Sequence, residues 1–256
     1  MTLLRVEHLS KSFGPSSAIE DLSFAISPGT IHSIIGPNGA GKTTLFNLIS
    51  GLYRPTSGTI WFDDADITAL PPHRRARCGL SRTFQNLQIF LNLSALDNVM
   101  VGYHLACDGR FLPSLLRLPS VVRRDRAYRE QAVALMRFVG LEAFVDAAAD
   151  AMPYGALKRL ELARALAVQP KMLLLDEPAA GLNPKETAEL DFLIQQIAAQ
   201  GITVVLVEHD MRLVWSVSNH ILVLDHGRKL AEGTGWEIRH NEDVVAAYLG
   251  EGGRHR

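Results

Sequence analysis

Apolar residues in the first third of the chain fall into short runs bounded by turn-forming residues. Leu22 to Ile26 alternates apolar and polar positions with a period of two, which is typical of a strand that buries one face. Further strands are predicted at Leu3 to His8, Ile31 to Ile35 and Gly58 to Phe62, with turns at Ser27-Pro28-Gly29 and Pro55-Thr56-Ser57-Gly58. The sequence therefore predicts a β-rich N-terminal region.

The pattern changes between about Ser94 and Val168. Apolar residues recur there with helical periodicity, most clearly from Ala127 to Val139 and from Lys158 to Val168, without strand-like alternation. These segments predict a helical insert.

Strand patterns return in the last third. Met172 to Leu175 and Ile202 to Val207 are continuous apolar runs, as expected for parallel strands buried on both faces. A helix is predicted between them, with Asn183 as N-cap and its end at Gly201, which gives a right-handed crossover. Ile221 to Leu224 and Arg228 to Glu232 flank Asp225-His226-Gly227 and predict a hairpin. The fold class is therefore α/β with a parallel sheet.

A glycine-rich loop follows the predicted strand that ends at Ile35. Gly36-Pro37-Asn38-Gly39-Ala40-Gly41-Lys42-Thr43 matches the phosphate-binding loop in full, and Thr44 continues into a helix closed by Gly51. The glycines let backbone N–H groups surround an anion, Lys42 can reach the outer phosphates, and the Thr43 hydroxyl can bind Mg²⁺. A glycine-rich turn without a ligand would explain neither the lysine nor the hydroxyl. Nucleotide binding is the leading interpretation.

Two adjacent carboxylates follow the predicted strand Met172 to Leu175. A nucleoside triphosphatase needs a carboxylate for Mg²⁺ and a group that acts on the attacking water, and Asp176 and Glu177 are the candidates for these roles. His209 follows the strand Ile202 to Val207, so it is expected at the same edge of the sheet, where it can hydrogen-bond the γ-phosphate.

Charge and hydropathy restrict the partners. The chain of 256 residues has a formal net charge of −1, which gives no support for a nucleic-acid-binding protein. The arginine-rich stretches Arg74 to Arg77 and Arg123 to Arg126 are interpreted as solvated basic faces. The first residues lack the apolar core of a signal peptide, and no run of about eighteen apolar residues occurs, so a membrane role is expected to come through a partner.

Six motifs in this order resemble those of the ATP-binding cassette (ABC) ATPases over nearly the whole chain. They are the phosphate loop Gly36 to Thr44, Gln85, the signature stretch Met152 to Leu166, Asp176-Glu177-Pro178, Ala180 to Asn183, and His209. The resemblance implies an α/β P-loop NTPase with a RecA-like core, an antiparallel β region and an α-helical subdomain. It also implies an ATPase domain over residues 3–250, with the helical subdomain inserted at about 90–168 and a short tail at 251–256.

The resemblance also implies roles for single residues. ATP would bind Gly36 to Thr44, and Phe13 lies where the family places a ring against the base, although a buried phenylalanine at a strand end is the alternative. Mg²⁺ would bind Thr43, Gln85 and Asp176, while Glu177, His209 and Gln85 would serve catalysis. The signature residues Pro153, Tyr154, Gly155 and Ala156 would contact the ATP of a partner subunit.

Gly79 to Phe90 and Ala246 to Glu251 resemble subunits that energise branched-chain amino acid uptake. Such subunits dimerise, homo- or heterodimerically, and sit at the cytoplasmic face of the inner membrane on two permease subunits fed by a periplasmic solute-binding protein. Urea or amide import, lipid or lipopolysaccharide export, and a soluble ABC ATPase in DNA repair or translation are the alternatives. No nucleic-acid partner is expected.

The signature departs from the family pattern. The family's Leu-Ser start and final Gln correspond here to Met152, Pro153 and Ala156. In the family the serine hydroxyl donates to the γ-phosphate across the dimer, and Pro153 has neither a hydroxyl nor a backbone N–H. Lower activity of the site that this signature completes is therefore expected.

Overall fold

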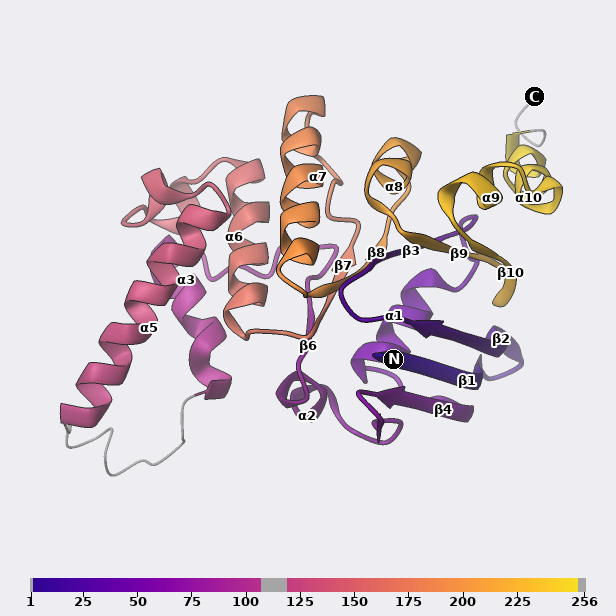
Figure 1. Cartoon of the computed structure of the whole chain (residues 1–256), viewed down its shortest axis with the longest axis horizontal. Helices are drawn as coiled ribbons and strands as arrows, with labels where there is room; N and C mark the ends of the chain where they lie inside the picture. Colours follow the sequence, from indigo (N-terminus) through magenta and orange to yellow (C-terminus); the bar gives the residue numbers. More distant parts are fainter. Residues whose placement is uncertain (1, 107–118, 253–256) are drawn as a thin grey trace. The chain divides into compact units, whose positions relative to one another are not determined.

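The computed structural model describes residues 2–106 and 119–252 (Figure 1). The chain divides into two compact units, the first formed by residues 1–82 and 171–256 and the second by Thr83–Pro170. The helices predicted between Ser94 and Val168 fall within the second unit. Residues 107–118 of this stretch lie outside the described part of the chain.

A six-stranded sheet forms the centre of the first unit, in the order β10-β9-β3-β8-β7-β6. Neighbouring strands are parallel from β6 to β9, and only the hairpin partner β10 is antiparallel. The strands are β3 (Ile31–Ile35), β6 (Leu80–Arg82), β7 (Met172–Asp176), β8 (Thr203–Val207), β9 (His220–Asp225) and β10 (Arg228–Gly233). The parallel sheet and the hairpin are confirmed, whereas the three-residue strand β6 escaped prediction because it is too short to show a period.

A second, antiparallel sheet has the order β2-β1-β4-β5. Two of its strands are longer than predicted, because pairing continues past register shifts near Leu9 and Lys11 into polar segments without clean alternation. Its strands are β1 (Leu4–Phe13), β2 (Ser16–Ile26), β4 (Ser57–Phe62) and β5 (Ala65–Asp66).

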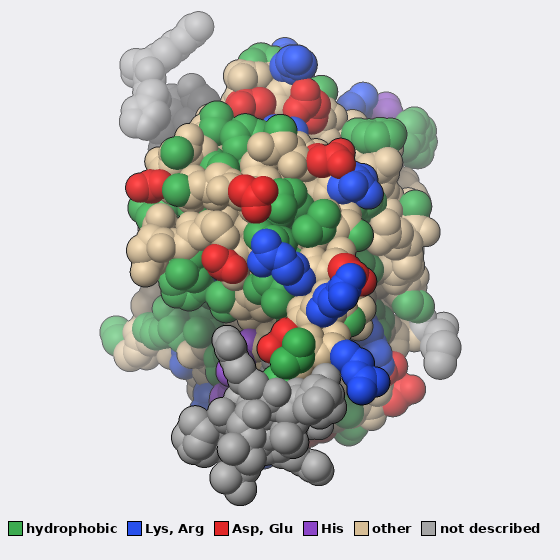
Figure 2. All heavy atoms as spheres, turned by 90° about the vertical axis from the view of Figure 1, so that its left-hand side faces the viewer, with side chains coloured by type: hydrophobic (Ala, Val, Ile, Leu, Met, Phe, Trp, Pro, Cys, Tyr) green, Lys and Arg blue, Asp and Glu red, His purple; other side chains and the backbone are tan. Residues whose placement is uncertain are grey.

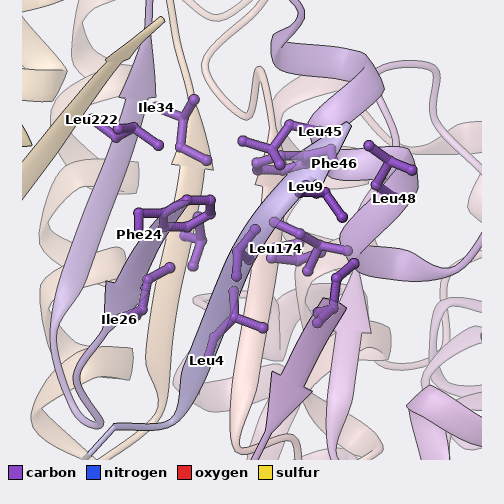
Figure 3. Packing of buried hydrophobic residues seen from close by; sticks show 14 of the residues in the cluster. Leu4, Leu9, Phe24, Ile26, Ile34, Leu45, Phe46, Leu48, Leu174 and Leu222 are labelled. Carbon is purple, nitrogen blue, oxygen red and sulfur yellow. The ribbon is translucent and has the colours of Figure 1, made fainter. Parts of the chain in front are cut away.

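Alternate residues of the parallel strands enter two different cores. Ile34, Leu174 and Leu222 pack with Phe24 and Phe46, which come from the antiparallel sheet and helix α1 (Lys42–Ser50) (Figure 3). Their neighbours, among them Ile35, Ile221 and Val223, join a separate cluster with Val214 and Ile238. A strand turns successive side chains to opposite faces, so the continuous apolar runs are required by burial on both faces.

The remaining helices of the first unit are short, apart from α7. In Figure 1, α7 and α8 lie on one side of the parallel sheet, and α1 and the antiparallel sheet lie on the other. The predicted N-cap of α7 is confirmed, because Asn183 accepts from the backbone of Lys185 and Glu186 in a capping box. The helices are α2 (Pro72–Arg77), α7 (Pro184–Ala199), α8 (Met211–Val217), α9 (Gly235–Arg239) and α10 (Glu242–Gly252). Helix α10 thus includes two residues of the predicted tail, whose remainder at 253–256 lies outside the described residues.

The interpretation of Arg74 to Arg77 as a solvated face is wrong for Arg75. Its side chain is fully buried and donates to the carbonyl oxygens of Leu48 and Ile49 at 2.6 and 2.7 Å. These carbonyls belong to the last turn of α1, where helix carbonyls lack the regular i+4 donor, and that of Leu48 also accepts from the N–H of the C-cap residue Gly51 at 3.2 Å. Burial lowers the pKa of Arg75 to about 10, so the guanidinium remains charged at neutral pH and stabilises the C-terminal end of α1.

The second unit is helical. Helices α3 (Ala95–Gly102) and α6 (Tyr154–Ala167) approach closely at Gly102, where an added Cβ would lie 2.5 Å from the Arg164 carbonyl oxygen. The other helical segments are η1 (Tyr103–Ala106), α5 (Pro119–Phe138), η2 (Glu142–Phe144) and η3 (Ala149–Ala151). Among the described residues of the whole chain, no helix is both long and apolar enough to cross a membrane.

The arginines of α5 do not form a surface of one charge sign. Arg126 is exposed and pairs with Glu130 at 3.1 Å, one turn further along the helix. Figure 2 shows acidic, basic and apolar side chains mixed on this side of the molecule. The solvated interpretation therefore holds for Arg126, where an exposed pair contributes little to stability.

His32 gives the fold a predicted acid sensitivity. Its ring lies in the buried strand β3, stacked on His220 with centroids 5.4 Å apart, and burial, followed by the charge of His220, lowers the pKa of His32 from 6.5 to about 4. The unfolded chain therefore binds the proton more tightly, so this contribution to stability is complete above pH 6.5 and is lost as the pH falls toward 4.

When the pH is lowered from about 7 to 4.5, the free energy of unfolding of the wild type should fall by about 2.5 kcal/mol more than that of His32→Leu, because only the wild type takes up a proton at this position on unfolding. Urea unfolding at both pH values measures the difference, and His73→Gln, which changes an exposed histidine of α2, is the control. Equal losses in the wild type and His32→Leu would contradict the assignment.

Candidate functional site

The loop between β3 and α1 is shaped by its glycines, two of which leave no room for a Cβ. A Cβ at Gly36 would lie 2.1 Å from the Leu224 carbonyl oxygen, and one at Gly41 would lie 2.6 Å from that of Ala18. Gly39 and Gly41 also have positive φ angles, of 80° and 101°, which favour glycine. The backbone is thereby held in the turn that lets N–H groups converge on an anion.

Lys42 and Thr43 open helix α1 directly after this loop. The Lys42 side chain is buried, and its Nζ donates to the carbonyl oxygens of Gly36 and Pro37 at 2.6 and 2.8 Å. Thr43 is exposed at the positive end of the helix dipole. An ammonium group, a hydroxyl and a glycine cradle fit a polyphosphate with its Mg²⁺, because each supplies a charge or ligand that the phosphates or the metal require.

Asp176 ends the buried strand β7, and its carboxylate forms an ion pair with Arg82. The Nη2 atom of Arg82 lies 2.8 Å from Oδ2 of Asp176, and the two side chains are 7% and 6% exposed. Sequence reasoning had given no role to Arg82, which ends β6. The available signal was an arginine three residues before Gln85, but it is informative only once β6 is known to neighbour β7.

Glu177 and His209 lie side by side at the edge of the sheet. Oε1 of Glu177 is 3.1 Å from Nε2 of His209, and both side chains are partly accessible to solvent. The paired strands β7 and β8 end together, with Asp176 opposite Val207, so they bring the two residues to one place. Glu177 has a φ of +48°, a strained conformation that is enriched at functional sites. A carboxylate and an imidazole so placed can accept a proton from water and orient a phosphate.

Glu208 is a second buried residue that sequence reasoning missed. Its carboxylate accepts from the backbone N–H of Ala179 at 2.8 Å and from that of His209 at 3.0 Å, joining the segments that follow β7 and β8. Burial raises the pKa of Glu208, and the charge of Glu177 adds to this. A charged residue directly after a buried apolar strand was the signal in the sequence.

Phe13 is accessible, so the alternative of a buried phenylalanine is wrong. Its ring is 46% exposed at the end of β1, meets Tyr53 edge-on at 5.3 Å, and lies 4.9 Å from Nζ of Lys11. The two rings support each other at the surface. Stacking of Phe13 on a nucleobase stays a prediction.

Gln85 and the signature residues belong to the second unit. Gln85 is exposed, and Pro153 is the N-cap of α6 without a side-chain cap hydrogen bond. Pro153 and Tyr154 are exposed, whereas Gly155 and Ala156 are buried, with Ala156 only 3% exposed. The expected contact of Ala156 with a partner's ATP can therefore come only from its backbone N–H in the first turn of α6.

Comparisons with known proteins show the family of the chain. The family model of the ABC transporters matches residues 19–180, and that of the branched-chain amino acid ATP-binding cassette transporters matches residues 228–254. The chain is 44% identical to BraF of Pseudomonas aeruginosa, a high-affinity branched-chain amino acid transport ATP-binding protein, over 97% of this chain and 98% of that protein. It is 35% identical to LptB of Escherichia coli, a lipopolysaccharide export system ATP-binding protein, over 98% of both chains.

A solved structure shows the same fold. The ADP conformation of MJ1267, an ATP-binding cassette of an ABC transporter, superposes with a TM-score of 0.85 at 32% identity and covers 98% of this chain and 99% of that one. The α/β fold with its parallel and antiparallel sheets is thus that of a known class of ATPase. The chain belongs to the ABC transporter family, as an ATPase cassette.

Proposed function

We propose that the chain is the ATP-hydrolysing subunit that energises import of branched-chain or other hydrophobic amino acids. The observation that carries the proposal is the match of residues 228–254, at the C-terminal end, to the branched-chain transporter model. The higher identity to BraF than to LptB, 44% against 35%, favours import over lipopolysaccharide export.

In the proposed mechanism, ATP lies on the loop Gly36 to Thr44 with its adenine near Phe13. Lys42 turns its ammonium from the loop carbonyls, 2.6 and 2.8 Å away, toward the outer phosphates. Thr43, Asp176 and Gln85 would hold Mg²⁺, which neutralises phosphate charge when bound. Glu177 accepts the proton of the attacking water, and His209, 3.1 Å from Glu177, orients the γ-phosphate.

The proposed assembly contains a second ABC ATPase subunit and two membrane permeases. Each ATP lies between the phosphate loop of one subunit and the signature of the other, where the first turn of α6 offers backbone N–H groups and the positive helix end. Residues 3–250 act as one ATPase domain with the helical segment as its subdomain. The subunit sits at the cytoplasmic face of the inner membrane, and a periplasmic binding protein takes part indirectly.

The second unit offers an accessible apolar surface for a permease. Phe84 and Phe90 are 39% and 47% exposed close to Gln85, and Arg164 lies 5.6 Å from the centroid of the Phe90 ring. Exposed aromatic residues are enriched at protein interfaces because their burial yields a large apolar area. We propose that a short cytoplasmic helix of the permease docks here.

Co-purification from membranes tests the assignment. We expect the tagged chain to recover amino acid permease subunits, and Phe90→Glu to reduce this recovery by about tenfold, because a charge would be buried in the interface. Phe192→Glu, at a 62% exposed position on α7, is the matched control and should change nothing. Recovery of lipopolysaccharide export subunits, urea or amide permeases, or no permease would contradict the proposed function.

A further inference from the structure

We propose that Arg82 is a positioning residue that holds Asp176 and helix α1 in one arrangement and thereby sets the Mg²⁺ dependence of ATP binding. The proposal rests on the assignment of Mg²⁺ to Thr43 and Asp176. It concerns a residue that contacts neither nucleotide nor metal in the proposed mechanism.

The guanidinium of Arg82 bridges two elements of the first unit. From Nη2 it donates to Oδ2 of Asp176 at 2.8 Å, at the end of β7. From Nη1 it donates to Oδ1 of Asn47 at 2.7 Å and to Oγ of Ser50 at 2.9 Å, both on α1. One planar group therefore fixes the distance and direction between a strand end and a helix.

The residues on α1 that Arg82 contacts share a helix face with Thr43. Positions 43, 47 and 50 are spaced by four and three residues, which places them in one row along the helix. Arg82 thus links Asp176 to the face of α1 that also carries Thr43, the other assigned Mg²⁺ ligand of the first unit. Rotation of α1 or of the carboxylate would break one of these hydrogen bonds.

Strand register explains why Arg82 can reach Asp176. In the parallel pair, Arg82 stands opposite Leu174, and Asp176 lies two residues further along β7 on the same face. That face packs on α1, because Leu174 belongs to the cluster that contains Phe46 and Leu48 (Figure 3). The Arg82 guanidinium lies 5.6 Å from the Phe46 ring centroid, so the aromatic face supports it from α1 as well.

Positioning and simple charge compensation predict opposite results when the cation is removed. If Arg82 only neutralised Asp176, its removal would leave a more negative site that binds Mg²⁺ more tightly. If Arg82 aligns the carboxylate with α1, its removal lets the ligands move apart and weakens Mg²⁺ binding. Arg82→Lys separates charge from geometry, because a lysine keeps the charge but lacks the planar fork that spans both partners.

The test is calorimetric titration of ATP into the full chain at a series of free Mg²⁺ concentrations and in EDTA. For Arg82→Gln and Arg82→Lys we expect the Mg²⁺ concentration that gives the half-maximal increase in ATP affinity to rise about fivefold or more, with ATP affinity in EDTA changed less than about twofold. Arg228→Gln removes an exposed ion pair with Glu20 in the same unit and should leave both values unchanged.

Asn47→Ala provides a second variant if both Arg82 variants fail to fold. It keeps the Arg82–Asp176 pair and the hydrogen bond to Ser50, removes one of the two hydrogen bonds from Arg82 to α1, and should shift the Mg²⁺ requirement in the same direction by about twofold. A lower melting temperature with an unchanged Mg²⁺ requirement, or tighter Mg²⁺ binding in Arg82→Gln, would overturn the proposal. ATP binding by the wild type that does not depend on Mg²⁺ would instead remove the metal assignment on which it rests.

Discussion

Glu177→Gln is expected to lower ATP hydrolysis by a factor of roughly 10² to 10⁴ while ATP still binds, because the amide cannot accept the proton of the attacking water. The substitution keeps the size of the side chain and leaves an oxygen or nitrogen within reach of His209, which lies 3.1 Å away. ATP should therefore accumulate at the interface of a trapped dimer. Steady-state phosphate release and size-exclusion chromatography with ATP measure the two effects.

Lys42→Ala is the matched contrast, because it removes a group that binds rather than one that reacts. Hydrogen bonds to a charged group contribute roughly 1.5 to 3 kcal/mol, so ATP affinity should fall about tenfold to a hundredfold and no trapped dimer should form. Hydrolysis by Glu177→Gln at a near wild-type rate would exclude Glu177 as the general base.

Pro153→Ser is expected to raise hydrolysis about tenfold or more in a homodimer, because it restores a hydroxyl that can donate to the γ-phosphate of the partner's ATP. Pro153 is exposed and needs no side-chain cap to hold α6, so the site can accept a serine, which is also a preferred N-cap residue. Ala156→Gln is a poorer test, since Ala156 is buried and a longer side chain would have to displace its neighbours.

Whether the chain forms a homodimer or a heterodimer decides at which of the two ATP sites Pro153→Ser raises the rate of hydrolysis. In a heterodimer whose partner carries an intact signature, one ATP site should turn over normally and the other slowly, and the substitution should accelerate only the slow site. Single-turnover hydrolysis separates the two phases. An unchanged rate in both kinds of assembly would show that the chain accommodates its altered signature.

Local signals were sufficient to predict most of the first unit from the sequence. Continuous apolar runs such as Ile202 to Val207 revealed strands buried on both faces, and Asn183 marked a helix start through its capping chemistry. The phosphate loop was recognisable because its glycines, lysine and threonine act over a few consecutive residues.

The features that escaped prediction depend on contacts between distant positions. Arg82 lies 94 residues from Asp176 in the chain, and Arg75 lies 26 and 27 residues from the carbonyl groups that it contacts. A buried arginine and a solvated one look alike in a sequence, because the difference lies in which strand or helix end is folded against them. Glu208 is a similar case, since the backbone N–H of Ala179 that donates to its carboxylate lies 29 residues away and comes close only when β7 and β8 pair.

The most direct measurement of the central claim is leucine uptake into vesicles that contain the chain, its permeases and the periplasmic binding protein, with ATP supplied on the cassette side. We predict uptake that requires both ATP and the binding protein and that Glu177→Gln reduces in proportion to hydrolysis. Uptake that proceeds at the wild-type rate with Glu177→Gln, or ATP hydrolysis that never moves leucine or a related hydrophobic amino acid, would contradict the account.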